Sequence, residues 1–212
     1  MPPDAKAVAS DGDRQWFIVG RWQEYEGESR ANLFRVVGVA LFYCVELGNY
    51  WSGNVDRPFH QAVTALALAW AFVALGVLFC LTRHFFPALL KYLSTTADLV
   101  LLTVILMLAD GPKSPLVVAY LLLIVVSLLR FSLPLIWFTS VGSMLCYMFL
   151  LGYAKWFASR DIRAARYQQA IFLLALVLTG FILGQVVRRV RRMAAEYAER
   201  VAANKPTGDR PS

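Results

Sequence analysis

The feature that most constrains this chain is a series of six long apolar runs separated by short polar segments. The hydrocarbon core of a bilayer is about 30 Å thick, and an α-helix needs roughly 20 apolar residues to cross it. The runs are residues 33–51, 63–81, 90–108, 115–129, 135–157 and 167–187. Their continuous apolar character indicates helices, because the strands of a membrane barrel alternate between apolar and polar residues.

Composition agrees with a chain whose solvent is lipid. Hydrophobic residues make up 58% of the chain and charged residues 17%, against about 45–50% and 25% in a typical soluble domain. The sequence therefore predicts an all-α, polytopic membrane bundle of about six transmembrane helices. We expect a cytoplasmic segment at 1–32 that could include an interfacial helix, a membrane domain at 33–187, and a basic helix with a disordered tail at 188–212.

The fourth run differs from the others in its length and in its connection to the next run. It is the shortest of the six, and Pro134 makes a tight connection to the fifth run. The two together could form a hairpin that barely crosses the membrane. Two separate spans are favoured, because the stretch 116–153 is too long for one helix to cross the bilayer once.

Orientation follows from the positive charges, which concentrate on the cytoplasmic side of membrane proteins. In a six-span arrangement, 15 of the 21 Lys and Arg residues fall on the side of the termini. The N-terminus shows no signal-peptide pattern. We therefore expect both termini in the cytoplasm and a multi-pass protein of a bacterial inner membrane. The loop around Arg160 is discordant, because its positive charges lie on the outer side.

Two carboxylates fall inside apolar runs, Glu46 in the first and Asp98 in the third. Ionised side chains are costly in a bilayer, so each should face protein or water. Asn49 lies one turn from Glu46 near the outer mouth, and Arg130 at the inner end of the fourth run could reach towards Asp98. Each carboxylate is either a ligand or proton site, or a structural hydrogen bond between helices.

The sixth run suggests helix association. Gly180 and Gly184 form a GxxxG pair, which lets another backbone approach closely in lipid. A seam with heptad-like spacing continues past the membrane. Its residues are Val187, Val190, Ala194, Tyr197 and Val201. This face predicts a homodimer through the sixth helix, with packing inside one subunit and a simple basic stop-transfer segment as the alternatives.

The sequence contains no recognisable catalytic, phosphate-binding or metal-binding motif. There is no phosphate-binding glycine loop, zinc-protease motif or nucleophile elbow. The three cysteines lie inside the runs and are predicted to be small apolar side chains. The basic residues flank apolar runs, which does not indicate nucleic-acid binding. The sequence therefore predicts no enzyme, no catalytic or metal site and no cofactor.

Residues 95–153 and the exit sequence GQVVRRVRRMAAEYAERV resemble a known group of membrane regions. These are the six-helix input regions of bacterial sensor histidine kinases, class III nucleotide cyclases and some serine/threonine kinases. The similarity lies in Asp98 early in the third run, the short turn ADGPKSPL, and the LLRFS break between runs four and five. No output domain follows here, so the resemblance implies a sensory module that acts through a partner.

The sequence thus predicts a non-enzymatic membrane sensor or regulatory module. Its expected partners are the lipid bilayer, a second copy of the chain, and a cytoplasmic kinase or cyclase. A structural or assembly membrane protein is the alternative. A small transporter is less favoured, because the two halves of the chain show no convincing repeat.

Overall fold

The computed structural model describes the backbone of residues 4–83, 89–130, 132–157 and 165–203. Within these ranges it describes the side chains from Tyr25 to Tyr197 and that of Arg200. Among the described residues, every regular element is a helix. The elements are α1 (Asp4–Trp51), α2 (Arg57–Thr82), α3 (Leu90–Leu108), two 3₁₀ turns η1 (Gly111–Lys113) and η2 (Pro115–Val118), α4 (Ala119–Leu128), α5 (Leu133–Trp156) and α6 (Arg166–Ala203). The prediction of an all-α membrane bundle is confirmed at this level.

Five of these helices contain a segment long and apolar enough to cross a membrane. The fourth run differs, because η2 and α4 together cover only Pro115–Leu128. At about 2.0 and 1.5 Å per residue, this stretch is roughly 23 Å long, which is shorter than a bilayer core of about 30 Å. The six equivalent spans predicted from the sequence are therefore five long helices and one short one.

The late start of α4 has a local cause in the turn before it. Gly111 has a φ of 59°, which L side chains rarely adopt. Pro115, four residues later, has no N–H to donate to a preceding helical turn. The Ser114 side chain accepts a hydrogen bond from the Leu116 N–H and starts a 3₁₀ turn. Residues 111–118 thus form turns, and the regular helix begins only at Ala119.

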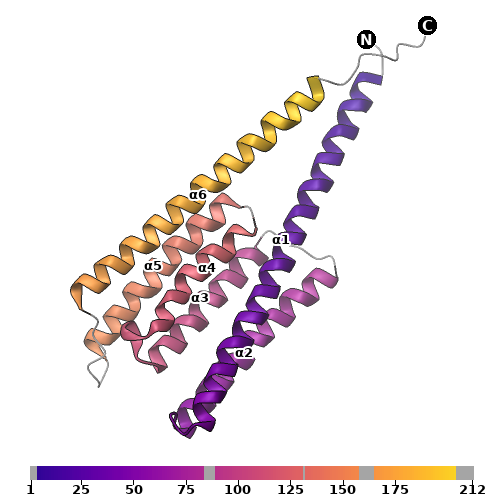
Figure 1. The fold of residues 1–212 in the computed structure, drawn as a ribbon. Coiled ribbons are helices and arrows are strands. Elements are labelled where there is room, and N and C mark those ends of the chain that lie inside the picture. The colour runs from indigo at the N-terminus through magenta and orange to yellow at the C-terminus, as the bar shows by residue number, and fades with distance from the viewer. Residues whose placement is uncertain (1–3, 84–88, 131, 158–164, 204–212) are drawn as a thin grey trace.

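The first helix is longer than any apolar run. It extends without a break from Asp4 to Trp51, over 48 residues. The segment 1–32 and the first predicted span therefore share one helix over the described residues. Figure 1 shows that the beginning of α1 and the end of α6 both project beyond the other helices at the same end of the bundle. We call these projections, residues 4–24 and 188–203, the two rods.

The apolar core lies among α3, α4, α5 and α6. Its largest fully buried apolar side chains include Leu106, Tyr120, Ile124, Ile136 and Tyr147. No described residue of α1 belongs to this buried cluster, and α2 adds only the partly buried Trp70. The pair α1–α2 thus packs mainly on itself, with α2 against α3. α1 therefore reaches the bundle mainly through α2, and its few direct contacts with α3 and α4 are made outside this apolar core.

The predicted association face of α6 is largely covered by the same chain. A Cβ at Gly180 would collide with the Ser140 side chain of α5, and a Cβ at Gly184 would lie 3.5 Å from Leu133. Val187, the first seam residue, is fully buried. The two glycines therefore let α6 approach α5, and the membrane part of the seam is not a free surface. Val190, Ala194 and Tyr197 are exposed, and the Val201 side chain lies outside the described ones.

Candidate functional site

The buried part of α1 is a short stripe of mostly polar residues. Glu28, Ala31, Asn32 and Arg35 are all buried, while the residues between them are exposed. Their spacing of three and four places them on one face of the helix. We call this face the polar stripe. It points at α3 and at the connection after α4, and it replaces the missing apolar contacts between α1 and the bundle.

Arg35 binds Asp98 of α3 through two parallel hydrogen bonds. Its Nε donates to Asp98 Oδ1 at 2.7 Å and its Nη2 donates to Oδ2 at 2.8 Å. The two side chains are only 4% and 9% exposed. The indole Nε1 of Trp70, on α2, donates a third bond to Oδ1 at 2.7 Å. Three helices thus meet at a single carboxylate, and a bidentate arginine pair of this kind is among the stronger charge-assisted contacts.

Asn32 extends this arrangement towards α2. Its Oδ1 accepts a bond from Arg35 Nη1 at 2.7 Å, and its Nδ2 donates to the Ala74 carbonyl oxygen at 3.1 Å. The amide therefore holds the guanidinium in line with Asp98 and ties α1 to the α2 backbone. Arg35, Asn32, Asp98 and Trp70 form what we call the Asp98 cluster.

A second cluster lies one to two turns closer to the end of the bundle from which the rods project. Arg130, in the connection between α4 and α5, donates from Nη2 to Glu28 Oε1 at 2.7 Å and from Nη1 to Thr95 Oγ1 at 2.6 Å. It also reaches the Ser94 hydroxyl and the Lys91 carbonyl oxygen, each at 3.1 Å. We call this the Arg130 cluster. It joins α1 and α3 to the end of α4.

Burial lowers the pKa of the Arg130 guanidinium from its ordinary value, and the neighbouring Glu28 carboxylate opposes the shift. An arginine stays protonated in either case. Removal of Glu28 would therefore leave the guanidinium buried and uncompensated. Because this cost applies to both clusters, the polar stripe has a strong preference for one docked position.

Close approach of α1 to the α4–α5 connection depends on Gly27. A Cβ at this position would lie 2.8 Å from the Leu129 carbonyl oxygen and 3.1 Å from the Arg130 Cα. Backbone atoms cannot move away as a flexible side chain can. Gly27 thus gives Glu28 the proximity to Arg130 that their short contact requires.

Glu46 belongs to a separate cluster at the other end of α1. Its Oε1 lies 3.2 Å from His60 Nδ1 on α2, and the His60 ring stacks on Tyr50 with centroids 4.1 Å apart. The Glu46 side chain is 11% exposed. Asn49 is exposed and makes no part of this contact in the described structure. The His60 contact joins the ends of α1 and α2 next to their connecting turn.

The structure changes the pairing expected from the sequence. Asp98 is buried between helices as predicted, but its hydrogen-bonding partners are Arg35 and Trp70, while Arg130 binds Glu28. Arg35 and Glu28 were missed as site residues because both lie near the beginning of the first run, where charges are ordinarily solvated. A signal was available, since Glu28 and Arg35 are seven residues apart and therefore share a helix face.

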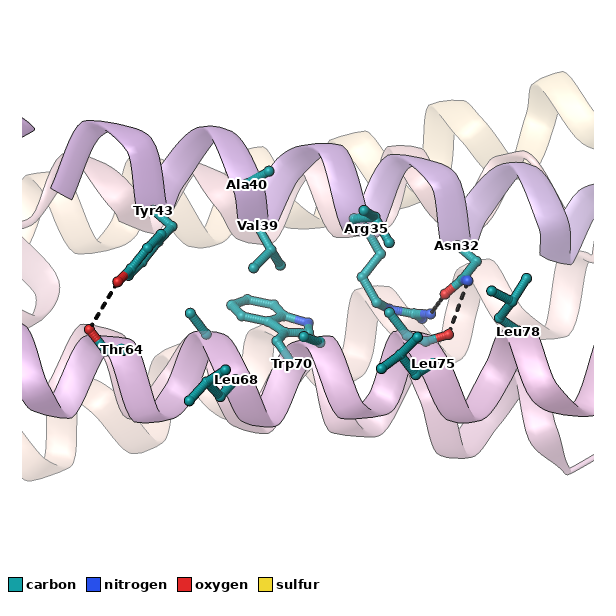
Figure 2. A pocket seen from close by; sticks show the side chains of 14 residues that line it. Asn32, Arg35, Val39, Ala40, Tyr43, Thr64, Leu68, Trp70, Leu75 and Leu78 are labelled. Atoms are coloured by element: carbon teal, nitrogen blue, oxygen red, sulfur yellow. Dashed lines mark hydrogen bonds between the residues drawn. The ribbon is translucent and has the colours of Figure 1, made fainter. Parts of the chain in front are cut away.

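A groove runs between α1 and α2 beside the Asp98 cluster. Its cavity volume is about 450 Å³. Figure 2 shows Trp70 pointing between the two helices, with Tyr43 and Thr64 at one end and Asn32 and Arg35 towards the other. The Tyr43 hydroxyl lies 3.3 Å from Thr64 Oγ1. The remaining walls are apolar side chains, chiefly Val36, Val39, Ala40, Ala67, Leu68, Ala71, Ala74, Leu75 and Leu78.

The chemistry of these clusters is that of ion pairing and hydrogen bonding. Within the described part of the chain, no three His, Cys, Asp or Glu side chains gather as metal ligands would. Comparison of the chain with known protein families, with curated proteins and with solved structures finds no match. The resemblance to membrane input regions therefore receives no support from relatives.

Proposed function

We propose that this chain is a non-enzymatic sensory or regulatory module of a bacterial inner membrane, which passes a change within the membrane to a partner protein. The observation that carries the proposal is the attachment of α1. This helix is held to α3 and α4 by the polar stripe, and it continues as an unbroken helix into a rod outside the bundle. A shift of the stripe would move the rod.

Attachment by ion pairs suits a helix that moves between two positions. Paired charges have discrete arrangements, because each partner must find another hydrogen-bonding group when the first contact breaks. We infer that the Asp98 and Arg130 clusters hold the docked state of α1, and that a signal acts by favouring or opposing this state.

We further propose six membrane crossings with both termini in the cytoplasm. The positive charges in the sequence favour this orientation. The common direction of the two rods in Figure 1 is consistent with it, because ends on one side require an even number of crossings. The short segment Pro115–Leu128, the fourth in chain order, would add one crossing to the five long helices. A reporter fused after Arg192 should then report cytoplasm, and one inserted near Lys113 should report the outside.

The partner in this proposal is a cytoplasmic kinase or cyclase that binds the two rods. The exposed side chains of Val190, Ala194 and Tyr197 offer an apolar strip for this contact or for a second copy of the chain. Since Gly180 and Gly184 already contact α5, a homodimer would use the cytoplasmic part of α6 rather than its membrane part.

A structural or assembly role is the second candidate. It is favoured by the complete pairing of the Asp98 carboxylate, both of whose oxygens accept hydrogen bonds from protein donors. A carboxylate satisfied in this way locks the three helices together. The two roles differ in whether the rods move when the lock is opened.

The experiment measures the distance between the rods. Spin labels are placed on cysteines at Ala9 and Ala194 in the full-length protein in lipid nanodiscs, after replacement of Cys44, Cys80 and Cys146. Arg35→Met opens the Asp98 cluster, whereas Arg30→Met removes only the exposed contact with Glu26. We expect the distance distribution to shift or broaden for Arg35→Met alone. An unchanged distribution in a folded Arg35→Met protein would refute the sensor proposal and leave the structural role.

A further inference from the structure

We propose that the groove between α1 and α2 binds one acyl chain of an inner-leaflet phospholipid, with the phosphate next to Arg83. This inference deepens the proposed function, because it names a ligand class for the same region. Binding in the groove does not require that the rods move, and only the choice of leaflet depends on the proposed orientation.

The position of the groove gives it access to lipid. Val36 and Leu68, which line it, are 48% and 57% exposed, and Leu75 and Leu78 are 58% and 49% exposed. All four belong to helices with the length and composition of membrane spans. The groove is therefore an indentation in the surface that faces hydrocarbon, and a chain of the bilayer can enter it from the side.

The length of the groove matches one leaflet. From Asn32 to Tyr43 along α1 is 11 residues, or about 16 Å at the helical rise. Half of a bilayer core is about 15 Å. Asn32 lies at the beginning of the apolar run of α1, and Tyr43 lies just beyond its middle. The groove thus begins where headgroups meet hydrocarbon and ends near the bilayer midplane, as an acyl chain of that leaflet does.

The polar groups in the groove lie at its two ends. The Tyr43 and Thr64 hydroxyls close the midplane end, and Asn32 with Arg35 marks the other (Figure 2). Between them the lining is apolar and rich in alanine, which leaves room for a methylene chain. A polar or charged ligand would lose its hydration along this stretch without gaining hydrogen bonds, whereas an acyl chain loses none.

The headgroup end carries a suitable cation. Arg83 follows the last turn of α2, is exposed, and lies with its guanidinium 5.3 Å from the centroid of the Phe79 ring. Arginine is well suited to phosphate oxygens. A chain seated in the groove would place its phosphate at this end of α2, and its methylenes would contact Trp70, which hydrogen-bonds Asp98. Occupancy of the groove therefore bears directly on the Asp98 cluster.

The test uses a phosphatidylglycerol with a photoreactive group midway along one acyl chain. The full-length protein is reconstituted with this probe in nanodiscs, irradiated, and digested for mass spectrometry. We expect labels concentrated on the groove residues Val39, Ala40 and Ala71. Labelling spread evenly over these positions and over exposed residues elsewhere, such as Leu145 and Phe149 of α5, would show ordinary lipid contact and overturn the proposal.

Matched variants sharpen the result. Ala71→Leu fills the groove, and Ala65→Leu makes the same change on an exposed part of α2 outside it. The groove labels should be lost only in Ala71→Leu. Arg83→Gln should weaken groove labelling, while Arg57→Gln, at the opposite end of α2, should not. Equal labelling in Ala71→Leu and Ala65→Leu refutes the chain site, and equal labelling in the two arginine variants refutes the placement of the phosphate.

The outcome is separable from that of the proposed function. Groove labelling reports binding in the resting protein, and the distance between the rods reports movement. Loss of the labels in Ala71→Leu together with unchanged rods in Arg35→Met would establish a lipid site in a structural protein. The reverse pair of results would establish a movable α1 without the lipid.

Discussion

Replacement of Arg35 by methionine is the most informative single perturbation of this fold. The methionine keeps much of the aliphatic length of the side chain but removes two of the three hydrogen bonds that Asp98 accepts from the described protein. The carboxylate, 9% exposed, is left with Trp70 as its donor. Breaking a buried ion pair by removal of one partner costs about 3–5 kcal/mol. We expect a loss of this size in the free energy of unfolding.

The same structure supplies the control. Arg30 forms an ion pair of similar length with Glu26, but the side chains are 62% and 52% exposed. An exposed pair with this helical spacing is worth about 0.3–0.5 kcal/mol. Arg30→Met should therefore cost several-fold less than Arg35→Met, although each variant removes one arginine from the same helix.

A double variant separates charge from packing. Asp98→Asn in the Arg35→Met background leaves a neutral amide whose oxygen can still accept the Trp70 bond. It should recover most of the lost stability, because the uncompensated charge is gone. The assay is reversible unfolding in mixed micelles, followed by tryptophan fluorescence. The reasoning is refuted if Arg35→Met costs no more than Arg30→Met, or if the double variant is no more stable than Arg35→Met.

Two glycine variants test the close helix contacts. Gly27→Ala should destabilise the protein by about 1–3 kcal/mol, the usual cost of overpacking, because its Cβ would meet the Leu129 carbonyl oxygen at 2.8 Å. Gly38→Ala on the same helix meets nothing within 4 Å and should be neutral or slightly stabilising in the same unfolding assay; equal effects would contradict the close approach. Gly180→Leu should lower stability by a similar amount through its collision with Ser140, and an unaffected stability with a loss of dimer in sedimentation would instead favour the self-association face.

The sequence by itself determined the chemistry of the spans. Crossing a bilayer requires that a segment satisfy its own backbone hydrogen bonds and present apolar side chains to lipid. Both requirements act on consecutive residues, so they can be read along the chain. The short fourth helix also has local causes in Gly111 and Pro115, which are visible in the sequence.

Continuity of the first helix was harder to predict from sequence. The change from polar to apolar residues near position 32 suggested a boundary between two segments. Helical hydrogen bonds run between neighbouring turns and do not depend on whether the side chains face water or lipid. A change of solvent therefore need not interrupt a helix, and α1 continues across it.

Only the tertiary structure decided which charges meet. Near the end of the bundle from which the rods project, Asp98 had two arginines within plausible reach, and either would have offset the cost of burying a carboxylate. The choice of Arg35 depends on the rotation of α1 about its axis and on the approach that Gly27 permits to the α4–α5 connection. For the same reason, the sequence did not show which helix packs against Gly180 and Gly184. Spacing along one helix shows which residues share a face, whereas the neighbour that covers that face is set by how all the helices pack together.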